Sequence, residues 1–168
     1  MLWVVIVLSI SSAAIAESWA YLYPQSFLEY FTQHQLIVFS ISCNVLVLFL
    51  FIILGIKSKF NRHGLWLAIP IFSIGVFLFG YAFLKLGKDR TFFGQELGTV
   101  EPKAYNEFPF SLGHTQYKGV MLSIFGLWLL FRPSHELTAV TGFWILTLCL
   151  QMYIESGPSV TGPVQREL

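Results

Sequence analysis

Long apolar runs separated by short polar segments dominate the chain, and they predict a bundle of membrane helices. The clearest run covers residues 36–56, which carry no charge and match the roughly 20 residues that a helix needs to cross a bilayer. Another run covers residues 64–86, with Pro70 near its start. Proline is tolerated in such a helix because neighbouring helices satisfy the carbonyl group that it frees. These two runs predict two transmembrane helices.

The first apolar run, residues 1–16, is shorter, and the sequence leaves two interpretations open. Residues 14–16 read Ala-Ile-Ala just before Glu17, which is the small-x-small pattern of a signal-peptidase site, but no lysine or arginine precedes the apolar stretch. The run is therefore either a short retained span or a cleaved signal. Residues 17–34 mix aromatic with polar side chains, which is typical of a segment at the membrane interface.

The last two runs, residues 119–131 and 137–154, predict a helical hairpin, because Pro133 and Ser134 between them are typical of a tight turn. The first of these runs reaches only about 20 Å as a helix. It crosses the bilayer only if the helix begins earlier, near Gln116; otherwise the pair enters the membrane and returns. The sequence thus predicts an all-α fold, a polytopic membrane bundle of four to five short transmembrane helices with a C-terminal helical hairpin.

Composition supports the membrane location. Apolar residues make up 55% of the chain and charged residues 11%, with a mean hydropathy of +0.68, whereas a soluble domain has about a quarter of its residues charged. The net charge is only +1, so nothing favours a nucleic-acid partner. We expect the lipid bilayer as a partner, and neither nucleic acid nor a metal ion.

Polar residues collect at the ends of the last two apolar runs. Residues 113–119 read Gly-His-Thr-Gln-Tyr-Lys-Gly, and Glu155 ends the final run. One explanation is that Tyr, His and Lys anchor helix ends at the level of the lipid headgroups. The other is a binding site, because a hairpin would return Glu155 to the level of His114 and Tyr117. A carboxylate placed there could hold a cationic or hydroxyl-rich ligand.

Four short motifs mark this half of the chain. They are Thr-Phe-Phe-Gly-Gln-Glu-Leu-Gly at residues 91–98, Glu-Phe-Pro-Phe at 107–110, Gln-Tyr-Lys-Gly at 116–119 and Glu-Ser at 155–156. In order and spacing, over residues 75–156, they resemble the phospholipid N-methyltransferases. These membrane enzymes methylate phosphatidylethanolamine or its N-methylated derivatives with S-adenosylmethionine. The His-x-x-Tyr-x-Gly pattern is shared with the isoprenylcysteine carboxyl methyltransferases, a wider superfamily of membrane enzymes.

The resemblance implies roles for individual residues. The glycine at position 119 would let a helix backbone approach the cofactor closely, and residues 73–75 lie where animal members carry a Gly-x-Gly that is also assigned to the cofactor. The implied ligands of S-adenosylmethionine are Ser73, Gly75, His114, Tyr117, Gly119 and Glu155.

The implied reaction requires that the protonated headgroup amine first lose a proton, and two residues are candidates for the base. His114 has an ordinary pKa near working pH, and Glu107 is the alternative. His114 could equally hydrogen-bond the cofactor. Lys103 and Lys118 would hold the lipid phosphate, although lysines also serve simply as headgroup anchors.

Two departures from the family pattern affect the site. Thr115 stands where the family usually has proline, so we expect a looser turn before Tyr117, and Ser156 replaces the second of two adjacent glutamates. They leave two alternatives to a phospholipid N-methyltransferase: an enzyme that acts on a prenylated cysteine carboxylate, and an inactive membrane subunit that keeps the fold.

The resemblance also suggests how the chain is organised and oriented. We assign residues 1–63 to N-terminal spans and a basic turn, 64–156 to a methyltransferase core and 157–168 to a tail, all within one membrane domain. Because S-adenosylmethionine is cytosolic, the motifs should face the cytosol, in the endoplasmic reticulum membrane of a eukaryote or the inner membrane of a bacterium. Basic residues favour that orientation slightly, since an excess of them marks the cytosolic side. The motif side carries Lys85, Lys88, Arg90, Lys103, Lys118 and Arg166, and the opposite side Lys57, Lys59, Arg62 and Arg132. This orientation requires that residues 1–16 be retained.

Overall fold

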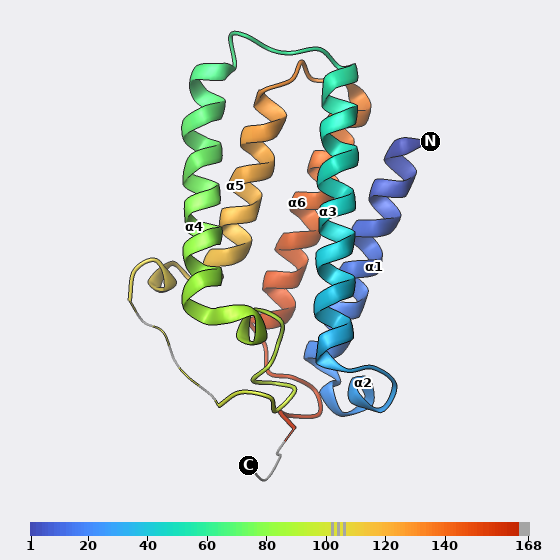
Figure 1. Ribbon diagram of the computed structural model, residues 1–168, viewed down its shortest axis with the longest axis vertical. Helices are drawn as coiled ribbons and strands as arrows, with labels where there is room; N and C mark the ends of the chain where they lie inside the picture. Colours follow the sequence, from blue (N-terminus) through green and yellow to red (C-terminus); the bar gives the residue numbers. More distant parts are fainter. Residues whose placement is uncertain (102, 104, 106, 165–168) are drawn as a thin grey trace.

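The computed structural model describes residues 1–164 except 102, 104 and 106, and these residues form a bundle of helices (Figure 1). The predicted all-α fold is confirmed. The helices are α1 (Leu2–Leu22), α2 (Pro24–Tyr30), α3 (Gln33–Lys57), α4 (Leu65–Thr91), α5 (Thr115–Leu129) and α6 (His135–Glu155), with one 3₁₀ turn, η1 (Phe110–Leu112).

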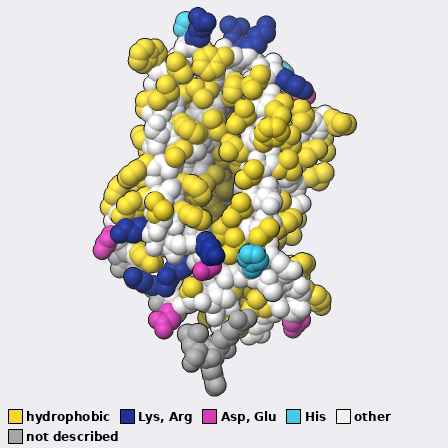
Figure 2. Space-filling view, viewed as in Figure 1, with side chains coloured by type: hydrophobic (Ala, Val, Ile, Leu, Met, Phe, Trp, Pro, Cys, Tyr) yellow, Lys and Arg dark blue, Asp and Glu magenta, His cyan; other side chains and the backbone are white. Residues whose placement is uncertain are grey.

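Four of these helices, α1, α3, α4 and α6, are long and apolar enough to cross a membrane. The helix α5 has 15 residues and reaches about 22 Å, and it begins at Thr115, one residue before the point that the hairpin prediction required. Together α5 and α6 form the predicted C-terminal hairpin. The surface along the long helices is covered with hydrophobic side chains, and charged side chains gather toward its two ends (Figure 2).

Local sequence signals explain where the helices begin. Thr32 caps α3 with a capping box, in which its hydroxyl accepts from the Gln35 backbone N–H and the Gln35 side chain accepts from the Thr32 backbone N–H. Ser134 caps α6 by accepting from the Leu137 backbone N–H. Pro24 sits in the first turn of α2, where its missing N–H costs nothing. The short helix α2 was not predicted from the apolar pattern.

The helices α4 and α5 pack closely through glycines. A Cβ atom on Gly119 would lie 2.5 Å from the Phe79 backbone nitrogen, and one on Gly75 would lie 2.5 Å from the Ser123 backbone nitrogen. Gly126 is in the same situation against Phe72. Small residues at such positions let helix backbones approach in a membrane, where packing drives association.

The main core lies between α1, α3, α5 and α6. Its buried members include Ile6 and Ile10 from α1, Phe51 from α3 and Trp144 from α6. The helix α1 continues through residues 14–17 without a break, so the first sixteen residues form part of the packed bundle.

Hydrogen bonds join the start of α3 to the end of α4 and to the segment that follows it. Gln33 is buried, and its amide donates to the Asp89 carbonyl oxygen at 2.8 Å and accepts from the Thr99 hydroxyl at 2.6 Å. Gly87, at φ +75°, bends the end of α4 toward this segment. The C-terminal segment then crosses beneath it, since the Val164 backbone N–H donates to the Glu96 carbonyl oxygen.

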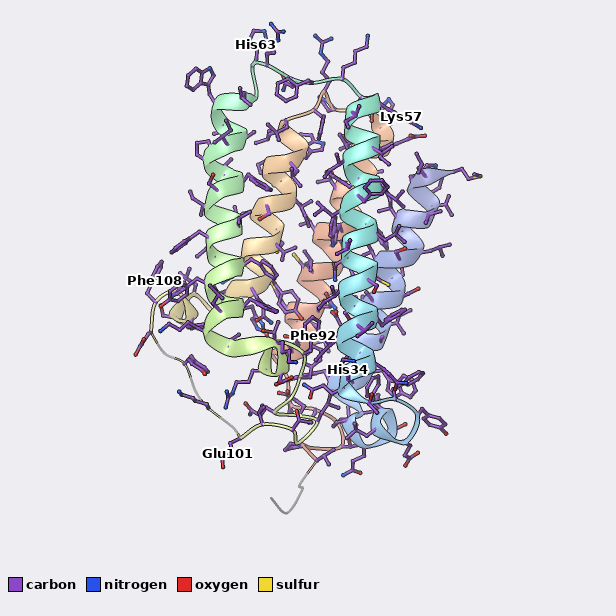
Figure 3. The ribbon with its side chains drawn as sticks, in the orientation of Figure 1. His34, Lys57, His63, Phe92, Glu101 and Phe108 are labelled. Carbon is purple, nitrogen blue, oxygen red and sulfur yellow. The ribbon has the colours of Figure 1, made fainter. Side chains whose placement is uncertain are left out.

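Charged side chains and histidines lie at both ends of the bundle. Lys57 and His63 lie at one end, and His34 and Glu101 toward the other (Figure 3). At the first end the Arg132 backbone N–H donates to the Lys59 carbonyl oxygen at 2.9 Å. Lys59 and Arg132, which the sequence assigned to the same side, therefore lie at the same end of the bundle. Arg166, which we counted with the motif side, falls outside the described residues.

Candidate functional site

Glu155, the last residue of α6, meets two side chains from the start of α5. Its Oε1 accepts a hydrogen bond from the Tyr117 hydroxyl, and its Oε2 lies 3.8 Å from His114 Nδ1. The expectation that a hairpin would return Glu155 to the level of these two residues is confirmed. The Glu155 side chain is 12% exposed and the His114 side chain 28%, so both are within reach of a ligand.

Further contacts tie this group to α1 and to the end of α6. The Tyr21 hydroxyl donates to the Glu155 backbone carbonyl oxygen at 3.0 Å and to that of Gly157 at 2.5 Å. Ser156 Oγ lies 3.2 Å from His114 Nε2. We call Tyr21, His114, Tyr117, Glu155 and Ser156 the outer cluster. Its members come from three helices and from both ends of the chain.

The His114 ring lies between Glu155 and Ser156. Its Nε2 atom pairs with the Ser156 hydroxyl, which itself donates to the Met152 carbonyl oxygen at 2.7 Å. Partial burial, and then the nearby Lys118 ammonium, lower the pKa of His114 below its ordinary value of 6.5, which keeps the imidazole neutral at pH 7.

The side chain of Thr115 joins the turn before Tyr117 to η1. Thr115 is buried, and its hydroxyl donates to the Pro109 carbonyl oxygen at 2.7 Å. His114, just before it, has a left-handed backbone with φ at 46°. The looser turn expected from Thr115 stays a prediction.

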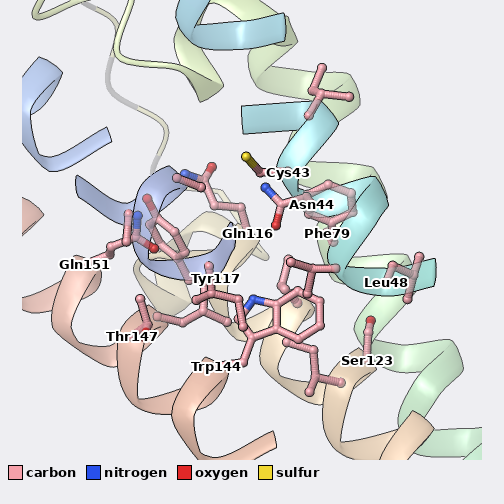
Figure 4. A pocket seen from close by; sticks show the side chains of 18 of the residues that line it. Cys43, Asn44, Leu48, Phe79, Gln116, Tyr117, Ser123, Trp144, Thr147 and Gln151 are labelled. Atoms are coloured by element: carbon pink, nitrogen blue, oxygen red, sulfur yellow. The ribbon is translucent and has the colours of Figure 1, made fainter. Parts of the chain in front are cut away.

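A cavity of about 570 Å³ adjoins the outer cluster and extends along the bundle. Apart from the Gln33–Asp89 hydrogen bond at one end, α3 and α4 have few contacts. The space-filling view shows a hollow on this face, surrounded by hydrophobic side chains (Figure 2). Its walls are apolar over most of their length, with a few hydroxyl groups, and its carboxylate, amide and phenol groups gather at one side. Figure 4 shows Gln116, Tyr117 and Gln151 there, with Asn44 approaching from α3.

A second carboxylate lies at this polar side. Glu17 from α1 lines the cavity, and its Oε2 accepts from the Gln151 amide at 2.5 Å. Ser40 from α3 lies beside Glu17; its hydroxyl is fully buried and has no hydrogen-bond partner among the described residues. Glu17 and Gln151 each precede an outer-cluster residue of their helix by four positions, or about 6 Å. We call Glu17, Ser40 and Gln151 the inner cluster.

Not all predicted site residues come together. Lys118 lies beside His114, but its ammonium donates to the Leu112 carbonyl oxygen. Glu107 and Lys103 are exposed in the segment before η1, and Lys103 lies over the Tyr105 ring, 5.1 Å from its centroid. The structure records no contact between either of them and the outer cluster.

The predicted cofactor glycines lie elsewhere. Gly75 and Gly119 face each other across the α4–α5 interface, where the backbone of the partner helix occupies the space beside each Cα. In this structure these glycines therefore permit the close approach of two helices and not that of a ligand. Ser73, two positions from Gly75, is exposed on α4. A cofactor contact for these three residues stays a prediction.

Sequence reasoning missed Glu17, Gln151 and Tyr21. A usable signal existed for Glu17, because a lone carboxylate inside an otherwise apolar spanning helix marks a functional site by default. We had instead assigned it to the start of an interfacial segment, residues 17–34. Its partner Gln151 is 134 positions away along the chain, and no local pattern links them.

Comparison of this chain with known protein families, with curated proteins and with solved structures finds no match. Within the described part of the chain, no three His, Cys, Asp or Glu side chains come together in a way that could hold a metal ion.

Proposed function

We propose that this protein is an S-adenosylmethionine-dependent methyltransferase that acts on the amine of phosphatidylethanolamine or of its N-methylated derivatives. The observation that carries the proposal is the meeting of Glu155 with His114 and Tyr117 beside an apolar cavity. These residues belong to two separate motifs that resemble the phospholipid N-methyltransferases.

The outer cluster fits the chemistry of the cofactor. S-adenosylmethionine carries positive charge on its sulfonium and amino groups, and when bound it supplies a methyl group already activated for transfer. The Glu155 carboxylate is partly exposed and has an imidazole and a phenol beside it. It would hold a cationic group, while the Tyr117 hydroxyl fixes its orientation.

The remaining residues would position the substrate, exclude water and accept a proton. The neutral imidazole of His114 can take up the proton that the headgroup amine releases. Apolar walls from α3 and α4 keep bulk water away from that transfer. The gap between these two helices would admit the acyl chains of a lipid from the bilayer.

The proposed reaction also sets an orientation. The outer cluster lies at the end of the bundle opposite the basic turns, and a cytosolic cofactor requires that this end face the cytosol. We therefore propose an endoplasmic reticulum membrane protein with the outer cluster at the cytosolic face.

The test is methyl transfer by the full-length protein in membranes. Labelled S-adenosylmethionine is supplied with a panel of phosphatidylethanolamine, its mono- and dimethyl derivatives and a prenylcysteine peptide. We expect label in the phospholipids. Label in the peptide alone would assign an isoprenylcysteine carboxyl methyltransferase instead, and the absence of label from every acceptor would favour a non-enzymatic subunit.

A matched pair of variants tests the site. Glu155→Ala leaves the Tyr117 hydroxyl unpaired and removes the charge that would hold the cofactor, so cofactor binding should weaken by about ten- to a hundredfold. Glu136→Ala makes the same change on an exposed residue at the other end of α6 and should leave binding unchanged. Equal cofactor binding by the two variants would remove Glu155 from the site.

A further inference from the structure

We propose that the inner cluster is the binding site for the ammonium group of the lipid, with the Glu17 carboxylate as its counter-ion. The lipid lies in the cavity with its amine against Glu17 and its acyl chains toward the gap between α3 and α4. This inference rests on the proposed function for the identity of the amine as a phospholipid headgroup.

The position of Glu17 supports this assignment. Among the described residues it is the one carboxylate that lines the cavity, and none of the lysines or arginines in that part of the chain does so. Its recorded hydrogen bond comes from the neutral amide of Gln151. A carboxylate in an apolar membrane cavity is costly unless a positive charge or several donors compensate it. A lipid ammonium supplies both the charge and up to three N–H donors.

The distribution of polar and apolar residues along the cavity also matches an amphiphilic ligand. Its carboxylate, amide and phenol groups gather at the Glu17 side, while the α3 and α4 walls are formed by residues such as Leu48, Ile52, Val76 and Phe79. A ligand that fits must therefore have one cationic, hydrogen-bonding end and a long apolar remainder. An alkyl ammonium headgroup followed by fatty chains has that arrangement.

The two clusters then have separate roles. Glu17 and Gln151 lie about one helical turn deeper than Tyr21 and Glu155. The Tyr117 side chain lies between the two levels, since it lines the cavity and also donates to Glu155. An amine held at Glu17 would lie beside Tyr117, on the membrane side of any ligand that Glu155 holds.

Binding of lipid without the cofactor tests this proposal. The full-length protein in maltoside micelles is titrated with phosphatidylethanolamine that carries brominated acyl chains, and quenching of tryptophan fluorescence is followed. Trp144 lines the cavity, and a Trp144→Phe variant identifies its share of the signal. Phosphatidylglycerol with the same brominated chains is the matched lipid, since it has no amine.

We expect the wild-type protein to prefer the amine lipid, and Glu17→Gln to weaken its binding at least about tenfold while leaving phosphatidylglycerol unchanged. Glu29→Gln, on an exposed residue of α2, should change neither. Glu17→Asp keeps the charge and should keep the preference, which provides a second variant should Glu17→Gln fail to fold. The proposal is overturned when wild-type protein binds both lipids equally or when Glu17→Gln retains full preference.

The failure of this inference is distinguishable from failure of the proposed function. Methyl transfer to phosphatidylethanolamine by a protein whose amine preference does not depend on Glu17 would keep the function and discard this site. An amine preference that depends on Glu17, in a protein that transfers no methyl group, would keep the site and discard the reaction.

Discussion

The α4–α5 interface and the face between α3 and α4 border the same cavity and are built in opposite ways. Along α4–α5, glycines bring the two backbones together, so that a single added methyl group at Gly119 would lie 2.5 Å from the Phe79 backbone nitrogen. Along α3–α4, large apolar side chains such as Leu48 and Phe79 border open space. The helices α4 and α5 lie close together because the glycines between them have no side chains. The helices α3 and α4 stay apart although the side chains between them are large.

This difference shows how a small bundle can combine rigidity with access. Helices in a membrane have no hydrophobic driving force for association, so close packing of small residues has to hold them together. The closed interface keeps His114 and Tyr117, at the start of α5, fixed against α4. The open face leaves a route from the bilayer to the cavity.

The largest effect should come from adding a methyl group at the closely packed α4–α5 interface. Gly119→Ala places a methyl group against the backbone of α4, which cannot move aside as a side chain could, so we expect destabilisation of about 1–3 kcal/mol. Thermal unfolding in micelles would report this as a lower midpoint. An unchanged midpoint would show that α4 and α5 are less closely packed than the structure has them.

An intermediate effect should come from filling the open face. Leu48→Trp adds bulk where Leu48 lines the cavity, so methyl transfer to a phospholipid should fall about tenfold, with cofactor binding unchanged. Leu46→Trp is the control, because Leu46 is exposed to a similar extent on the same helix but does not line the cavity. Equal activity of the two variants would mean that lipid does not enter between α3 and α4.

The smallest effect should come from a glycine that faces neither interface. A Cβ atom on Gly80, in α4, would meet nothing within 4 Å. Gly80→Ala should therefore stabilise the protein by up to about 1 kcal/mol, because alanine favours the helix. The same substitution thus has opposite signs at Gly80 and Gly119. A fall in the unfolding midpoint of Gly80→Ala would contradict the open surroundings of that residue.

The spanning helices were predictable from the sequence because each is encoded by its own continuous apolar run. The run over residues 36–56 became α3, which extends beyond it at both ends, and the run over residues 64–86 became α4, which extends beyond it at its C-terminal end. The helix α2 was not predicted, since its aromatic residues show no clear period, although Pro24 at its first position was an available start signal. The extension of α1 past Ala16 was obscured by Glu17.

The outer cluster was partly predictable and the inner cluster was not. His114, Tyr117 and Glu155 end apolar runs, and a hairpin turn is a local feature that brings such ends together. The contacts of Tyr21 and Glu17 join α1 to α6, and they depend on how the whole bundle closes. The packing role of Gly119 was also out of reach, because it depends on which helix lies opposite.

The hydrogen bonds between α1 and α6 have a consequence for biosynthesis. As the chain leaves the ribosome, the helix that carries Glu17 and Tyr21 is made before the helix that supplies Gln151 and the Glu155 carbonyl oxygen, with α3, α4 and α5 between them. Until α6 is made, α1 therefore holds a carboxylate without this partner, which is costly inside a bilayer. Both clusters can form only once α1 and α6 are in the membrane together.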